Sequence, residues 1–338
     1  MAWNPIQMKN ENLSVLRGVF LNQRCATKPQ LAKLSGLSVV SVNSLLNELL
    51  ETGEVQQDQM MPSGGGRPAC QYRYNERYKM ALTAYMYVHN GKEQLYLEVH
   101  DLFQELLSSA RYSIEELDAD KLEQIISQLM KQYPTISVMV FGIPGTEHKG
   151  KLKVMDYAVF QSQKLFTRLR STYQIPVLIE NDINAALFGY CQRQNIRQEC
   201  TAGLYFPRKY SPGSAVYIRG DIYRGANHMV GELDQLPLGV NWTKENLSDE
   251  EQLHNMDLLI QSIACMYDPH ALLIYCDTMT EALLKQLISI MKTEWKVLTP
   301  PDIILRNDIH EDFSLGVQAI AARELFDQII RKERGASL

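Results

Sequence analysis

The stretch Ile175–Tyr190, IPVLIENDINAALFGY, places three polar residues directly after a run of apolar ones. The apolar run predicts a buried strand, and the alanines and leucine after the triplet predict the opening of a helix. Polar groups at the carboxyl end of a strand lie where open α/β sheets bind ligands. Glu180-Asn181-Asp182 is therefore a candidate ligand site. A purely structural role stays open, because Asn and Asp are also good helix N-caps.

Length and charge bound the class of protein. With 338 residues, 45% of them apolar, the chain is long enough to form the cores of two or three domains. Residues 1–75 carry seven Lys/Arg and five Asp/Glu, whereas the other 263 carry 27 and 34, so the net charge of −5 belongs to the later part. This distribution permits an N-terminal contact with an anionic partner without requiring one.

The six cysteines are scattered and include no C-x-x-C pair. In a chain without a recognisable signal peptide, this predicts reduced thiols and a cytoplasmic location. No apolar run approaches the roughly 20 residues that cross a bilayer, so we expect no membrane contact.

Residues 1–75 have the pattern of a winged helix-turn-helix. A helical spacing of apolar residues over Asn12–Leu21 is followed by two helices that Thr27 and Ser38 would cap. The second of these runs to Glu51, and a hairpin through Tyr74 would form the wing. A small helical domain for protein contact is the alternative.

The helix after Ser38 would lie in the major groove and expose Ser, Asn and Val side chains to base edges. It contains no Lys or Arg, so attraction to phosphates must come from Arg24, Lys28, Lys33 and Arg67. Arg67 lies on a Gly- and Pro-rich loop, whose narrow tip suits a minor groove. The predicted DNA-binding residues are Lys28, Val40, Ser41, Asn43, Ser44, Asn47 and Arg67.

The rest of the chain alternates strands with helices, which predicts an α/β fold. We expect one lobe over residues 76–190 and a second over 191–314. A last helix, Leu315 to Arg331, would pack back on the first lobe.

Four segments carry a resemblance to a known family: Gly65–Ala69, Phe141–Gly145, Glu180–Ala186, and Arg224–Asn227 with the Gly231-Glu232 that follows. In this order, behind a helix-turn-helix, they resemble the ROK family of bacterial sugar kinases and repressors, over about residues 12 to 330. The resemblance implies an N-terminal winged helix-turn-helix followed by a two-lobed actin-like sugar-kinase fold, with sugar bound between the lobes.

The resemblance also implies roles for single residues. In the family's kinases the aspartate matching Asp182 is the general base, and the residues matching Asn181 and Glu232 hydrogen-bond sugar hydroxyls. The candidate sugar-binding residues are therefore Gly145, Asn181, Asp182, His228 and Glu232.

The sequence departs from the family's kinases at both nucleotide elements. Ala84–His89 stands where the glycine-rich phosphate turn would be, and Tyr275–Asp277 replaces a Gly-Gly pair. Phosphoryl transfer depends on positioning the phosphates, so we expect no catalytic residue and no enzyme activity. No cysteine lies between Cys200 and Cys265, where the family has a zinc segment, so we expect no metal and no cofactor.

These features predict a sequence-specific repressor of carbohydrate metabolism, which binds a palindromic operator in double-stranded DNA as a homodimer or larger homo-oligomer. Its effector would be a sugar or sugar phosphate. Two alternatives stay open: an active ATP-dependent sugar kinase with an appended DNA-binding domain, and a regulator whose lobes are only a ligand-independent dimerisation scaffold.

Overall fold

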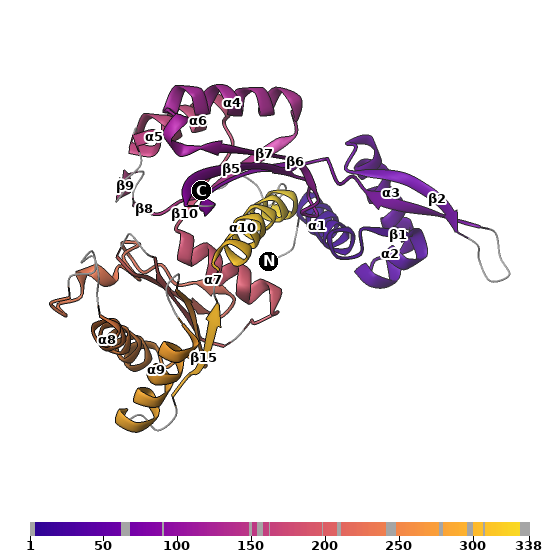
Figure 1. Ribbon diagram of the computed structural model, residues 1–338. Coiled ribbons are helices and arrows are strands. Elements are labelled where there is room, and N and C mark those ends of the chain that lie inside the picture. The colour runs from indigo at the N-terminus through magenta and orange to yellow at the C-terminus, as the bar shows by residue number, and fades with distance from the viewer. Residues whose placement is uncertain are drawn as a thin grey trace.

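The computed structural model describes residues 4–61, 68–89, 91–148, 151–153, 158–161, 163–197, 199–207, 211–240, 248–276, 280–295, 300–306 and 308–331. An N-terminal domain lies beside two α/β lobes, and two helices from different parts of the chain lie between the lobes (Figure 1).

The N-terminal domain packs three helices against a small antiparallel sheet of order β1-β3-β2. Thr27 and Ser38 cap its second and third helices, as predicted. The first helix begins seven residues before the predicted Asn12, because its opening turns are exposed and their apolar residues do not follow helical spacing. The elements are α1 (Pro5–Gln23), β1 (Cys25–Thr27), α2 (Lys28–Ser35), α3 (Val39–Glu51), β2 (Val55–Met61) and β3 (Ala69–Tyr74).

Lobe 1 contains a five-stranded sheet of order β10-β7-β4-β5-β6. Strands β4, β5 and β6 form an antiparallel meander, and β7 and β10 run parallel to β4. Helices α4 to α6 cover one face of this sheet (Figure 1). The elements are β4 (Met80–His89), β5 (Lys92–His100), β6 (Leu106–Ser113), η1 (Ile114–Glu116), α4 (Ala119–Gln132), β7 (Ile136–Gly142), β8 (Thr146–His148), β9 (Lys151–Lys153), α5 (Ala158–Gln161), α6 (Gln163–Tyr173) and β10 (Val177–Glu180).

Lobe 2 repeats that topology. Its sheet has the order β15-β14-β11-β12-β13. Strands β11, β12 and β13 form the antiparallel meander, and β14 and β15 run parallel to β11. The two lobes are thus variants of one unit. The elements are β11 (Thr201–Phe206), β12 (Gly213–Ile218), β13 (Asp221–Ile222), η2 (Leu233–Gln235), α8 (Asp249–Tyr267), β14 (Ala271–Cys276), α9 (Glu281–Glu294) and β15 (Asp302–Arg306).

Helices α7 (Asp182–Arg193) and α10 (His310–Arg331) cross at the centre (Figure 1). Their backbones approach so closely that a Cβ on Gly316 would lie 1.8 Å from the Ala185 carbonyl oxygen, and one on Gly189 would lie 2.1 Å from the Asp312 carbonyl oxygen. Only glycine fits such a crossing.

The start of α10 corrects the sequence prediction, which placed it at Leu315. The helix begins at His310. Its first turn contains the fully buried Asp312, whose carboxylate pairs with Arg193 and Arg306. A buried carboxylate held by arginines from two other elements gives no apolar periodicity in the local sequence.

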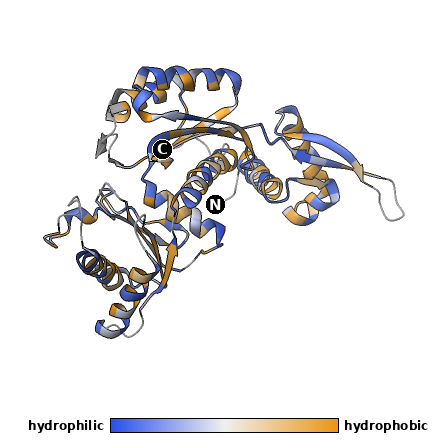
Figure 2. Cartoon of the chain, in the orientation of Figure 1, coloured by the Kyte–Doolittle hydropathy of each residue, from blue (hydrophilic) through white to orange (hydrophobic). Residues whose placement is uncertain are grey.

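At its other end α10 reaches the N-terminal domain, where the Ser14 hydroxyl on α1 donates to the Ile330 carbonyl oxygen over 2.9 Å. One hydrophobic cluster joins residues of α1, α10 and α7, and two further clusters fill the outer layers of the lobes. Peripheral helices such as α4 show hydrophobic and hydrophilic stretches in alternation (Figure 2), because one face of each packs on its sheet.

Candidate functional site

A cavity of about 310 Å³ opens between the lobes, where β10 ends and α7 begins. Of the residues predicted to bind sugar, the structure brings four together in its lining: Gly145, Asn181, Asp182 and Glu232. His228 is exposed, has a positive φ of 54° and is not among the lining residues. The cavity thus gathers four residues from two lobes and leaves the fifth outside.

Asn181 and Asp182 form the first turn of α7. The Asn181 side chain accepts hydrogen bonds from the backbone N–H of Ile183 (3.1 Å) and of Asn184 (3.4 Å), so it caps the helix as well as lining the cavity. Asp182 Oδ1 accepts from the Ile183 N–H at 2.7 Å. Burial raises the pKa of Asp182 to about 6, against the opposing effect of that hydrogen bond. A carboxylate so placed titrates close to neutral pH.

Glu232 reaches the cavity because of the glycine before it. Gly231 has a φ of 101°, and a Cβ there would lie 1.9 Å from the Ser214 carbonyl oxygen. The Gly231 carbonyl in turn accepts from the Ser214 N–H at 3.0 Å, and Glu232 forms an isolated β-bridge with Gly213. The Gly-Glu pair is therefore an added edge on β12 that fixes the carboxylate at the cavity wall.

A partly buried ion pair, which no sequence motif predicts, links the lobes. Arg224 donates through Nε (3.0 Å) and Nη2 to Glu180 Oε2 at the end of β10. Glu180 also accepts from the Asn184 side-chain amide at 2.9 Å. Arg224 lies in a motif segment, but no local pattern shows which carboxylate it meets.

Lobe 1 contributes Tyr87 to the cavity lining, beside Met86, Val88 and Glu93. The Tyr87 hydroxyl contacts both carboxylate oxygens of Asp308 at 3.1 Å, and its ring lies 4.1 Å from that of His310. Tyr85 stacks on Tyr96 with ring centroids 5.1 Å apart. The Tyr87 contacts join strand β4 to the segment that leads from β15 into α10, and the Tyr85–Tyr96 stack joins β4 to β5.

Among the residues whose placement is described, no group of three or more His, Cys, Asp or Glu is arranged to hold a metal ion. Within those same stretches, no helix is long and apolar enough to cross a membrane.

The N-terminal domain presents the predicted polar surface on α3. Val42, Leu45 and Leu49 are buried, while Val40 is 80% exposed. Asn43, Ser44 and Asn47 are exposed on the same helix, and Ser41 is half-buried.

Two of the expected cations have neighbours that bear on DNA contact. Lys28 Nζ donates to Asn43 Oδ1 at 2.6 Å, which places it beside the exposed stripe of α3. Arg24 lies over the Phe103 ring at 4.6 Å, so it faces lobe 1. Arg67 lies outside the described residues.

Comparison with known sequences shows which family and which relatives the chain is similar to. Residues 85–245 match the ROK family. The chain is similar to the putative xylose repressor of Caldicellulosiruptor sp. (strain Rt8B.4), with 22% identity over 256 residues, 70% of this chain and 61% of that protein. It is likewise 22% identical over 243 residues to the xylose repressor of Bacillus subtilis (strain 168), covering 70% of this chain and 63% of that one. These matches span less than two thirds of the relatives' length.

Solved structures show the same fold. A ROK family transcriptional regulator, homologous to the E. coli MLC protein, superposes with a TM-score of 0.62 and 14% identity over 97% of this chain and 100% of its own. A ROK family protein from Streptococcus pneumoniae TIGR4 in complex with sucrose gives 0.59 and 14% identity over 73% of this chain and 99% of its own. The family resemblance and the fold class predicted from the sequence are confirmed.

Proposed function

We propose that the chain, whose residues 85–245 match the ROK family, is a sugar-responsive DNA-binding transcriptional regulator, a repressor whose two lobes bind a sugar without phosphorylating it. The observation that carries this proposal is the presence, in one chain, of a helix with an exposed polar stripe and an interlobe cavity lined by Asn181, Asp182 and Glu232. The similarity to xylose repressors agrees with it.

The cavity's chemistry favours an uncharged sugar over a sugar phosphate. Its described lining includes four carboxylates and neither Lys nor Arg. Carboxylate and amide oxygens suit vicinal hydroxyls, whereas a phosphate group would meet like charge. The four carboxylates are Glu93, Asp182, Glu232 and Asp234.

The wall on lobe 1 argues against a kinase. In place of a glycine-rich turn, β4 presents Tyr87, hydrogen-bonded to the Asp308 carboxylate. A γ-phosphate held there would face a tyrosine ring and a negative charge, and phosphoryl transfer needs backbone donors and cations at that position. Without a bound γ-phosphate, Asp182 would have no phosphoryl transfer in which to act as general base, despite its raised pKa.

The route from cavity to DNA would run through α7 and α10. A sugar that draws the lobes together displaces α7, and the glycine crossing leaves no side chain between α7 and α10 to absorb that motion. Because α10 ends against α1, the displacement reaches the DNA-binding domain. A ligand with different affinities for two lobe positions therefore changes DNA affinity.

The test uses the full chain. Duplexes selected from a random library are bound and followed by fluorescence anisotropy, monosaccharides are then titrated in, and ADP release with ATP is measured in parallel. We expect sequence-specific binding that one or more sugars change, with no ADP release. Asn47→Ala should weaken DNA binding and leave sugar binding intact, whereas Glu232→Gln should do the reverse.

Two outcomes favour the alternatives. Turnover of ATP with a sugar would indicate the kinase with an appended DNA-binding domain. The second is DNA binding that no sugar alters, together with an unchanged melting temperature of the protein in each monosaccharide. It would indicate that the lobes serve only to dimerise, since a ligand that binds the folded form must raise the melting temperature.

A further inference from the structure

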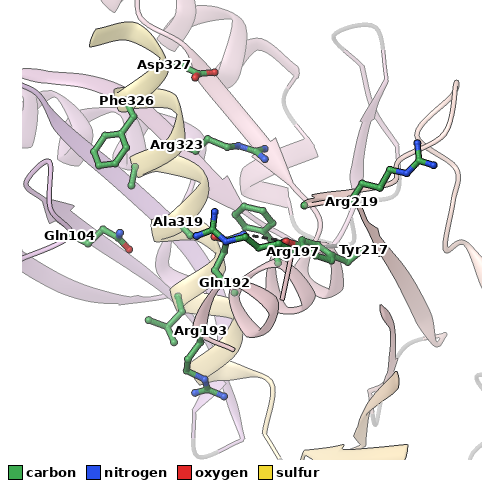
Figure 3. A pocket seen from close by; sticks show the side chains of 15 residues that line it. Gln104, Gln192, Arg193, Arg197, Tyr217, Arg219, Ala319, Arg323, Phe326 and Asp327 are labelled. Carbon is green, nitrogen blue, oxygen red and sulfur yellow. Dashed lines mark hydrogen bonds between the residues drawn. The ribbon is translucent and has the colours of Figure 1, made fainter. Parts of the chain in front are cut away.

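A second and larger cavity, of about 1230 Å³, lies further along α7 (Figure 3). Residues of α7, β12 and α10 form its walls, together with Gln104 from the turn between β5 and β6. The first turn of α7 lines the sugar cavity and its later turns line this one. The two cavities therefore share α7, α10 and β12, but none of their described lining residues is the same.

The charge of this cavity is opposite to that of the first. Among the described residues, four arginines and one carboxylate, Asp327, line it, on a chain whose net charge is −5. Two of the arginines are satisfied by acids: Arg193 pairs with Glu311 and Asp312, and Arg323 pairs with Asp221.

The other two arginines form no ion pair within the described part of the chain. Arg197 Nε donates to the side-chain oxygen of Asn195 at 2.9 Å, which leaves its terminal nitrogens for another acceptor. Arg219 is exposed in the turn after β12 and has a φ of 52°. In Figure 3 Arg197 lies among the other lining side chains, whereas Arg219 stands at their edge with its guanidinium pointing outward.

Neutral polar and apolar groups complete the surface. The Tyr217 hydroxyl, which donates to the Ile196 carbonyl oxygen at 2.8 Å, lies beside Gln192 in the cavity wall. Phe188 and Phe326 supply apolar area, and the Arg323 guanidinium lies 4.9 Å above the Phe188 ring. Planar guanidinium groups pair with phosphate oxygens through two parallel hydrogen bonds. The apolar wall suits the organic part of the same molecule.

We propose that this cavity is a second ligand site, which binds a small phosphorylated metabolite through Arg197 and Arg219. Because of the position of this cavity, such a ligand could act on the DNA-binding domain. Phe103, the neighbour of Gln104 in the same turn, packs under Arg24 of that domain, and α10 ends against α1. The site is independent of the sugar cavity, so each can be present without the other.

The experiment is isothermal titration of the full chain with inorganic phosphate, pyrophosphate and glucose 6-phosphate, at constant ionic strength set by NaCl. Glucose serves as the uncharged comparison. We expect phosphate compounds to bind, and Arg197→Gln or Arg219→Gln to weaken them at least about tenfold each, as for the loss of a hydrogen bond to a charged group. Arg111→Gln, the same charge change on exposed β6, is the matched control and should bind as the wild type does.

Three results would overturn the site. The first is no binding up to millimolar concentrations, and the second is equal binding by the Arg197→Gln/Arg219→Gln double variant. The third is binding of glucose 6-phosphate that Glu232→Gln abolishes and the double variant retains, because it would place that ligand in the sugar cavity. Sedimentation velocity of the double variant checks a further alternative: dissociation of an assembly, with phosphate binding unchanged, would make this face a contact between copies.

Discussion

The raised pKa of Asp182 gives a stability prediction that can be worked out in numbers. The change is Asp182→Asn, which keeps an oxygen for the hydrogen bond from Ile183 N–H and removes the charge. In the folded chain the pKa rises from 3.8 to about 6. At 1.36 kcal/mol per unit, the charged carboxylate costs the folded state about 3 kcal/mol.

The direction of the pKa shift gives the sign of the change in stability with pH. A carboxyl whose folded-state pKa is raised stabilises the protein while it is protonated, and that contribution is lost as pH rises through about 6. About 2 kcal/mol of the loss falls between pH 4.5 and 8. The wild type should therefore lose stability relative to Asp182→Asn over this interval, and the variant should be the more stable protein at pH 8.

The assay is a series of thermal or urea unfolding curves for both proteins from pH 4.5 to 8. Comparison of matched proteins cancels the titration of every other group. Asp302→Asn, which changes an exposed carboxylate on β15, is the control and should follow the wild type. If the curves of Asp182→Asn and wild type stay parallel across this interval, Asp182 is hydrated and the desolvation argument is wrong.

Three further predictions concern the helices. Gly316→Ala should destabilise the chain by about 1–3 kcal/mol, because its Cβ would meet the Ala185 carbonyl oxygen; Gly18→Ala on α1, with nothing within 4 Å, is the control and should be neutral or stabilising by thermal unfolding. Arg17→Met should cost about 3–5 kcal/mol, since it leaves Glu54 buried without its bidentate partner; recovery in Arg17→Met/Glu54→Leu would confirm that the stranded charge is the cause. Asn47→Ala should weaken operator binding about 5- to 150-fold at unchanged melting temperature, in the range of one good base contact. Loss of binding with Asn22→Ala on α1 would instead indicate a non-specific effect.

Local chemistry explains which parts of the fold the sequence predicted. N-caps at Thr27 and Ser38, the alternation of buried and exposed residues on α3, and the buried strands of both lobes all depend on neighbours within a few residues. Strands β6 and β15 were not predicted because they are edge strands of mixed, partly exposed composition.

The candidate sites also divide into residues that short motifs predict and residues that only the fold brings together. Asn181, Asp182 and Glu232 were found through short motifs, and the cavity that joins them depends on the positive φ of Gly231, which the motif itself contains. His228 has the same kind of motif signal but is exposed and does not line the cavity. Neither the Glu180–Arg224 pair nor the arginine cavity follows from local sequence, because their members are brought together by the lobes.

The arrangement of α7 and α10 bears on why a regulator would keep a two-lobed sugar fold. A close crossing of two backbones is stiffer than a contact through side chains, because no rotamer change can take up a displacement. Helix α7 lines the acidic cavity with its first turn and the basic cavity with its later turns, and α10, which crosses it, contacts α1. Two ligands of opposite chemistry would then act on one rigid element. Their effects on DNA affinity should be coupled, so that each changes the apparent affinity of the other by the same factor.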